Sequence, residues 1–354
     1  MKKILLSLFC VLTQFVASQN LLKANVDERI ELASAFCYAV GFENIFDDYI
    51  ESYFNEVKKL AIKAKSKRIY PLKLTIPSFQ YTIENYKLIV EDALCWKIEN
   101  GNVISDLKIH SPLKNILSLE EYKLFIDCVN KFYNASLFSD FFISNKLLYL
   151  QAEQLYDSLV LSKYEPQFYL DLFGKDNFHF NVYVSLLNGN IHISSSDKHS
   201  VIMGGLCDKY GPNYDYISLG FIDFEENSRM YHFLKNISDL FISEFIHDYI
   251  SSTKNSSMNY YKSSLLLFER NHYDAGSIFK EQLCMLMSLL YFNKLGIRQI
   301  DLEQIVIQQK MEGFIWQNEM WNYVKTFDNN RSQYPYFQDF LPSFVSYYRT
   351  ILSY

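Results

Sequence analysis

The sequence is short of several features that define common classes of protein. It has 6 cysteines in 354 residues, widely spaced and without a C-x-x-C pair, which excludes a disulfide-rich scaffold and a cysteine zinc site. The net charge is -6 and no basic stripe is present, so a nucleic-acid partner is not expected. No internal repeat or low-complexity linker divides the chain. After the N-terminus no run of about 18 apolar residues occurs, so no later membrane span is predicted.

Residues 1–18 have the composition of a secretory signal peptide. Lys2 and Lys3 precede a short apolar run that ends at Val16, and small residues follow it up to Ser18. The run is too short to span a bilayer. Cys10 lies inside the run, where a lipid-modified cysteine is not expected. The sequence therefore predicts cleavage near Ser18 and a secreted or periplasmic protein.

What the sequence has in quantity is aromatic side chains, with 28 Tyr and 29 Phe. Most of them recur at helical spacing, which is typical of side chains that pack in a helical core. This spacing predominates in residues 27–165. The helices expected within that region include 82–95, 119–136, 137–143 and 145–163.

A small sheet is expected between about 177 and 224. Residues 178–186 alternate between apolar and polar side chains, as a half-buried strand does. Asn188-Gly189 is a signal for a type I′ hairpin turn, with 191–193 in the partner strand. Two further strands are expected at 201–206 and 216–224. The predicted sheet is mostly antiparallel.

Helices return after the sheet. They are expected at about 227–252, 260–270, 277–294, 301–311, 313–327 and 336–350, and Asp301 would cap the fourth of these. Helices, then a sheet, then helices, without βαβ alternation, favour a mainly helical α+β fold. The predicted organisation is a signal peptide (1–18), a helical N-terminal region (19–165), and a region with the sheet and the C-terminal helices (166–354). The last two would pack as one compact unit.

One segment comes close to a catalytic motif. Ser243-Glu244-Phe245-Ile246-His247 differs at a single position from H-E-x-x-H, in which two histidines one helical turn apart bind zinc and the glutamate is the general base. Here Glu244 would be the base and His247 the second ligand, with Ser243 at the first ligand position. Glu281, on a later predicted helix, could supply the third ligand. The pattern E-x-x-H is a weak signal alone, since 269–272 also matches it.

Longer blocks carry a resemblance to a known family. They are 26–32, 172–174, 243–248, 312–316 and 334–342. Through them the chain resembles, over about 26–350, a family of secreted bacterial proteins of unknown function, often from Bacteroidota, with a gluzincin-like H-E-F-x-H helix. The resemblance implies a zincin-like, metallopeptidase-like scaffold. It also implies the roles of base for Glu244, second zinc ligand for His247 and third ligand for Glu281, and Ser243 departs from it.

Ser243 weakens the prediction of zinc binding, because a serine hydroxyl is a poor zinc ligand and catalytic sites usually have three protein ligands. The favoured interpretation is a degenerate homologue that has no cofactor, has no zinc-peptidase activity and keeps its surface for a peptide or protein ligand. In that interpretation, Ser243→His would create zinc binding.

Two other interpretations stay open. One is an active metallohydrolase whose zinc site is completed by another histidine, at 179, 192, 199, 232 or 272. The other is a secreted interaction protein in which the motif has no functional content. Hydrolysis by Ser243, Glu244 and His247 without a metal is disfavoured, since a helical serine lacks a strained turn and an oxyanion hole.

Overall fold

The computed structural model describes most of the chain after the predicted signal peptide. The described residues are 22–42, 45–46, 50–67, 76, 79–105, 111–175, 178–189, 191–204, 224–271 and 273–353, with only the backbone described at 224–228. The predicted signal peptide, nearly all of the strand expected at 216–224, and His272 lie outside these residues.

Helices make up most of the described chain. The N-terminal half contains α2 (Glu28–Val40), α3 (Glu51–Ser66), α5 (Ile83–Asp92), α7 (Leu119–Ser136), α8 (Phe138–Ser144) and α9 (Lys146–Leu159), with the 3-10 turns η2 (Ala93–Cys95), η3 (Pro112–Asn115) and η4 (Leu161–Lys163). The C-terminal half contains α10 (Pro166–Phe173), α11 (Phe224–Ile242), α12 (His247–Ser263), α13 (Leu265–Arg270), α14 (Ile278–Lys294), α15 (Gln299–Met311), α16 (Gln317–Asn329) and α17 (Phe337–Ile351). Asp301 is not the cap of α15: it lies in the first turn and pairs with Arg298, the N-cap residue.

The strands in the described part of the chain form two small sheets. They are β1 (Ala24–Asn25), β2 (Lys97–Glu99), β3 (Asn102–Ile104), β4 (Asn181–Val184), β5 (Ile193–Ser195) and β6 (Ser200–Met203). The larger sheet has the order β1-β4-β6-β5, and β2 and β3 form a separate hairpin. A few short strands among many helices confirm the predicted α+β class.

The strand pairing differs from the prediction. β4 runs parallel to both β1 and β6, and only β5 is antiparallel to its neighbour, so the larger sheet is mixed rather than mostly antiparallel. The expected hairpin at Asn188-Gly189 is wrong, because β6 lies between β4 and β5. Instead of closing a hairpin, the buried Asn188 side chain accepts hydrogen bonds from Ser34 Oγ (2.9 Å) and Tyr86 Oη (2.7 Å). The tight turn is at 196–199, between β5 and β6, where His199 has φ of 44°.

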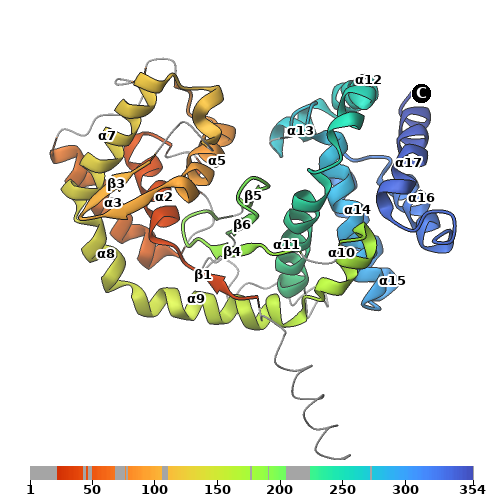
Figure 1. Ribbon diagram of the computed structural model, residues 1–354, viewed down its shortest axis with the longest axis horizontal. Helices are drawn as coiled ribbons and strands as arrows, with labels where there is room; N and C mark the ends of the chain where they lie inside the picture. Colours follow the sequence, from red (N-terminus) through yellow and green to blue (C-terminus); the bar gives the residue numbers. More distant parts are fainter. Residues whose placement is uncertain are drawn as a thin grey trace, which may run out of the picture.

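The larger sheet lies between two groups of helices (Figure 1). Helices α2, α3, α5, α7 and α8 lie on one side, the helices from α10 onward lie on the other, and α9 runs along the base beside β1. Both α5 and α11 contact β5, so this edge strand lies between the two groups. One cluster of buried hydrophobic residues extends through both groups, from Ala24 to Leu352.

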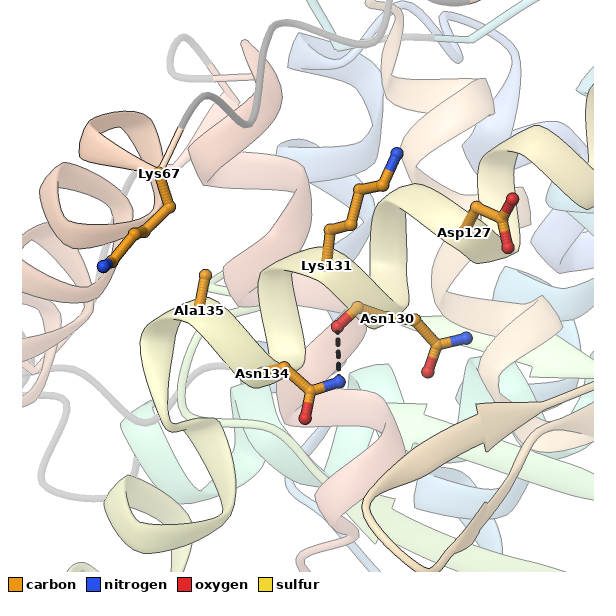
Figure 2. A pocket seen from close by; sticks show the side chains of 6 residues that line it. All are labelled: Lys67, Asp127, Asn130, Lys131, Asn134 and Ala135. Carbon is orange, nitrogen blue, oxygen red and sulfur yellow. Dashed lines mark hydrogen bonds between the residues drawn. The ribbon is translucent and has the colours of Figure 1, made fainter.

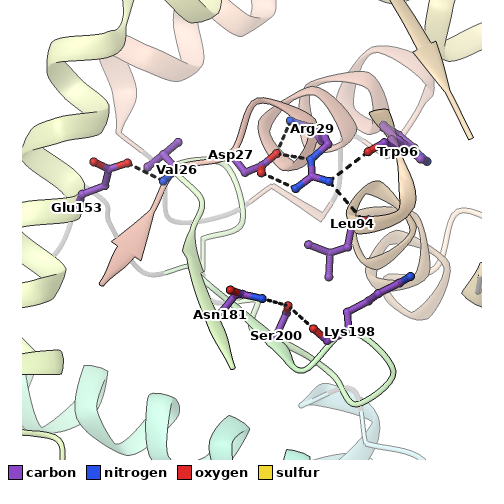
Figure 3. Close-up of polar contacts among 9 residues, drawn as sticks. All are labelled: Val26, Asp27, Arg29, Leu94, Trp96, Glu153, Asn181, Lys198 and Ser200. Atoms are coloured by element: carbon purple, nitrogen blue, oxygen red, sulfur yellow. Dashed lines mark hydrogen bonds and ion pairs between the residues drawn. The ribbon is translucent and has the colours of Figure 1, made fainter. Parts of the chain in front are cut away.

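The start of α2 is tied to η2 (Figure 3). Asp27 caps the helix by accepting from Arg29 N (2.9 Å), and the two side chains form an ion pair of 2.6 Å. The Arg29 guanidinium also donates to the carbonyls of Leu94 (3.3 Å) and Trp96 (3.1 Å), which joins α2 to η2. The first of the family-like blocks, 26–32, therefore has a structural explanation.

Glu31, in the same block, is fully buried between α2 and the sheet. Its carboxylate accepts from Leu186 N (2.9 Å) and from Tyr53 Oη (2.7 Å). Burial raises the pKa of Glu31 to about 7, although hydrogen bonds from Ser185, Tyr53 and Leu186 act in the opposite direction. Glu31 thus fixes the end of β4 against α2.

Candidate functional site

The motif-like segment is a turn between two helices. Helix α11 ends at Ile242 and α12 begins at His247, so the single helix predicted over 227–252 is interrupted at 243–246. Helix α11 is continuous through Asn236, whose side chain donates to His232 O (2.8 Å). Ile246 is buried in the turn, and Phe245 packs against Phe173, which explains why the chain bends here. Ser243 and His247 therefore do not lie one turn apart on a continuous helix.

The side chains of this turn face different surroundings. Glu244 is 42% exposed and forms an ion pair with Lys175, at the end of α10. His247 is exposed at the first position of α12. Ser243 Oγ is buried, and none of the described residues forms a hydrogen bond with it. Glu244, the residue predicted to be the base, is therefore paired with Lys175 near the surface.

Glu281 lies beside an earlier part of α11. Its carboxylate is 2.6 Å from Lys235 Nζ. Lys235 is eight residues before Ser243, which corresponds to about 12 Å along the helix. Glu244 and Glu281 thus contact different lysines at separate places. In the described part of the chain, no three His, Cys, Asp or Glu side chains are grouped so that they could hold a metal ion.

A second polar region, which the sequence did not indicate, lies where Lys235 and Glu281 meet. We call it the α11–α14 cluster and define it by Lys235, Asp239, Lys280 and Glu281. Lys280 Nζ is 2.5 Å from Asp239 Oδ1, and Ser194 Oγ of β5 donates a short hydrogen bond to the same carboxylate. The four charged side chains are only 20–30% exposed. Two ion pairs therefore join α11 to α14.

The Lys235–Glu281 pair dominates the electrostatics of the cluster. Burial alone would lower the pKa of Lys235, but the Glu281 carboxylate and the nearby Tyr273 and Tyr231 outweigh it and raise that pKa well above its usual value. Burial would likewise raise the pKa of Glu281, but Lys235 lowers it below its ordinary range. Both groups are therefore charged near neutral pH.

Two histidines adjoin the cluster. The rings of His192 and His232 are 4.6 Å apart between centroids, and His192 Nδ1 accepts a hydrogen bond from Gly204 N (3.1 Å). Burial lowers the pKa of His232 to about 4, with Lys235 acting in the same direction. Burial lowers the pKa of His192 well below its usual value, and His232 and then Lys235 act in the same direction. Both imidazoles are therefore neutral near pH 7.

A chain of buried amides supports the same face of α11, one turn earlier. Gln309 Nε2 donates to Tyr231 Oη (2.8 Å), Gln317 Nε2 donates to Gln309 Oε1 (2.7 Å), and Gln282 Nε2 donates to Gln317 Oε1 (2.8 Å). The three glutamines are at most 1% exposed. This chain links α11, α14, α15 and α16 and holds Tyr231 in place, one turn before Lys235.

Among the described histidines that might have completed a zinc site, none is placed beside Ser243, and His272 lies outside the described residues. His232 is 11 residues earlier on α11, about 16 Å along the helix. His199 packs its ring on Phe178 in the β5–β6 turn, and His179 is exposed. One sequence signal for the cluster existed: 231, 235 and 239 fall on one face of a helix at a spacing of four.

A separate hollow lies on the surface of the N-terminal half, between the end of α3 and α7 (Figure 2). It is lined by Lys67, Asp127, Asn130, Lys131, Asn134 and Ala135. The Asn130 side chain also pairs with both backbone groups of Val103, at 2.6 Å and 2.9 Å, and so anchors β3. We place no function in this hollow.

Comparison with family models, with curated proteins and with solved structures finds no match for the chain. The family resemblance of the five sequence blocks therefore stays a prediction. Across the described residues no helix is both long and apolar enough to cross a membrane. Cys37, Cys95, Cys128 and Cys284 are free thiols.

Proposed function

We propose that the protein is a secreted, zincin-like scaffold that has no zinc chemistry and acts by binding a peptide or protein ligand. The observation that carries the proposal is the ion pair between Lys235 of α11 and Glu281 of α14. The Lys235 ammonium pairs with the Glu281 carboxylate, which a metal ion would otherwise need as a ligand. Since Lys235 is charged near neutral pH, it does not release Glu281 for a metal.

The positions around this pair support a zincin-like origin. In an H-E-x-x-H site, two side chains four residues apart on one helix face a glutamate from a later helix. Tyr231 and Lys235 are four residues apart on α11 and lie on the side of Glu281. A mixed sheet with an antiparallel edge strand, β5, contacts the same helix. We therefore place the metal-equivalent position at Lys235 rather than at Ser243.

The first experiment is a metal analysis of the purified mature protein, followed by a zinc titration. We expect less than stoichiometric metal and no saturable zinc binding in the micromolar range. One tightly held zinc per chain that a chelator removes would defeat the proposal.

The second experiment builds the motif at the two candidate places. The triple change Tyr231→His, His232→Glu and Lys235→His, with Glu281 kept, should create a zinc site, because it supplies three ligands and a base. The matched control is Ser243→His, for which we expect no comparable gain since residues 243–246 form a turn. If Ser243→His alone binds zinc tightly, the metal-equivalent position is at the turn.

Secretion is tested separately. The full-length chain should be processed near Ser18 when it is expressed with an intact export pathway, and the mature N-terminus can be read by mass spectrometry. Retention of residues 1–18 in the folded protein would contradict this part of the proposal.

A further inference from the structure

Helix α9 carries apolar side chains on its outer side. Leu147 is 70% exposed, Leu150 and Leu155 are each 43% exposed, and Ile143 at the end of α8 is 67% exposed. Figure 1 shows α9 along the base of the molecule, with the larger sheet and both groups of helices on its other side. Single exposed leucines are common on protein surfaces, but several on one side of a helix indicate a contact surface.

The outer side of α9 is also uncharged. From Leu147 to the end of the helix, the exposed residues are leucines, glutamines and a serine. We call them the α9 outer face, which consists of Leu147, Leu150, Gln151, Gln154, Leu155 and Ser158. Helix α7 differs, since Lys123, Asp127 and Lys131 are exposed on it at a spacing of four. Charged residues usually cover the solvent side of a helix and are depleted from the centre of protein interfaces, so the α9 outer face has the composition of an interface.

The inner side of α9 is held firmly by the rest of the molecule. Three of its side chains are at most 6% exposed: Tyr149, Ala152 and Tyr156. Asp157 Oδ1 accepts a hydrogen bond from Ala24 N of β1 (2.8 Å). Glu153 Oε1 accepts from Val26 N (2.8 Å; Figure 3). The two acidic residues of α9 therefore bind the N-terminal strand region, and the outer face belongs to a well-anchored helix.

The order of residues on the α9 outer face is the same in both directions. Gln151 and Gln154 are flanked by Leu150 and Leu155, so the sequence reads Leu-Gln-x-x-Gln-Leu about a centre between 152 and 153. If two such helices pack antiparallel about a two-fold axis at that centre, Leu150 lies level with Leu155 of the second copy, and Gln151 lies level with Gln154 of the second copy. A glutamine amide can both donate to and accept from another amide. The face is therefore complementary to a second copy of itself.

Helix α15 also exposes apolar side chains, but without this symmetry. Ile300 is 55% exposed, Ile307 is 48% exposed and Met311 is 71% exposed. A two-fold axis that set Ile300 level with Met311 would set Gln304 level with Ile307, so an amide would face an apolar side chain. The pattern therefore favours self-association at α9 over self-association at α15.

We propose that the α9 outer face is the surface through which two copies of this chain form an antiparallel, two-fold symmetric dimer. The contact centres on one helix of 14 residues, with Ile143 extending it. Small interfaces form weak or transient complexes, so we expect a dissociation constant in about the micromolar range. The surface lies apart from the Lys235–Glu281 pair, so the dimer and the proposed zinc-free scaffold are tested independently.

The first test is sedimentation velocity on the whole mature protein, at concentrations from below to well above the micromolar range. We expect a reversible equilibrium between monomer and dimer. Leu150→Glu brings one carboxylate from each copy into the contact and should weaken the dimer by at least about tenfold. Ile307→Glu, at a position of similar exposure on α15, is the matched control and should dimerise as the unchanged protein does.

Circular dichroism of both variants separates loss of contact from loss of folding, since both substituted positions are exposed and helix content should be unchanged. A mature protein that stays monomeric at every concentration would overturn the proposal. So would a folded Leu150→Glu variant with an unchanged dissociation constant, or a loss of the dimer in Ile307→Glu alone.

The second test is disulfide crosslinking, which examines the two-fold arrangement. About the proposed axis, the two copies of residue 154 are offset by about 4.5 Å along the helices, and the two copies of residue 147 by about 16 Å. On oxidation, Gln154→Cys should therefore form a disulfide between copies and Leu147→Cys should not. The unchanged protein, oxidised in parallel, is the control for its own free thiols. A disulfide in Leu147→Cys and none in Gln154→Cys would contradict the proposed dimer.

Discussion

The α11–α14 cluster and the turn at 243–246 both involve α11, and both contain a lysine–glutamate ion pair. The Lys235–Glu281 side chains are 20% and 30% exposed, and each is strongly affected by burial. The Lys175–Glu244 side chains are 24% and 42% exposed at the surface. The comparison shows that a motif-like sequence can occupy an ordinary surface turn, while residues that match no motif form the less exposed group of charged side chains.

The largest effect should come from breaking the Lys235–Glu281 ion pair, which we call the inner pair. Lys235→Met leaves the Glu281 carboxylate without its partner, and we expect it to lower the free energy of unfolding by about 2 kcal/mol, less than for a fully buried pair. Removing both charges with Lys235→Met and Glu281→Leu should recover most of the loss. Urea denaturation measures both. If the single and double variants are equally unstable, the loss comes from packing and not from the unpaired charge.

The next effect concerns Gly174, which ends α10 in the αL conformation. Gly174 precedes Lys175, so it helps to position the Lys175–Glu244 ion pair, which we call the outer pair. Gly174 has φ of 66°, and an added Cβ would lie 2.6 Å from the ring of Tyr336. Gly174→Ala should cost about 1–2 kcal/mol through backbone strain and displacement of that ring. Gly296→Ala is the matched control, since Gly296 has φ of 74° and no atom within 4 Å of the added Cβ.

The Gly174 variant also tests the family-like blocks, because Gly174 and Tyr336 belong to two of them. If Gly174→Ala and Gly296→Ala are equally destabilised, the contact between the two blocks contributes little to stability. Thermal unfolding of both variants in parallel decides the point.

The third effect is a pH dependence from the histidine beside the inner pair. The folded pKa of His232 is about 4 and its ordinary value is 6.5, so the unfolded chain binds more protons between these values. The stability contributed by neutral His232 is present above pH 6.5 and is lost as the pH falls toward 4, by roughly 1 kcal/mol per pH unit. His232→Gln should flatten the curve of unfolding free energy in this window. An unchanged slope would place the acid sensitivity elsewhere.

Glu31 adds a trend of opposite sign. Its folded pKa, about 7, lies above its ordinary value of 4.5, so the folded protein binds an extra proton between these values and loses stability as the pH rises through them. Glu31→Gln should remove that trend and keep most of the hydrogen bonds. Comparing the two variants separates the contributions of the two groups.

The sequence predicts the elements of this fold that local side-chain patterns determine, and it misses those that depend on contacts between distant segments. Periodicity predicts α7 and α14 within one or two residues, because their apolar faces pack along their whole length. It misses the β1–β4–β6 pairing, since parallel strands are joined through distant segments and Asn188 is recruited into the core. It also misses the α11–α14 cluster, because Lys235 and Glu281 are 46 positions apart and come together only when α14 packs on α11.

The smallest effect should come from the outer pair. Lys175→Met repeats the substitution proposed for Lys235, at a lysine whose glutamate partner is 42% exposed. Methionine keeps the apolar packing near Phe178 and Phe241, and water can solvate the released Glu244 carboxylate, so we expect a loss below about 0.5 kcal/mol. The same urea experiment applies. A loss as large as that of Lys235→Met would mean that the turn depends on its ion pair as strongly as the cluster does, and the contrast between the two regions would fail.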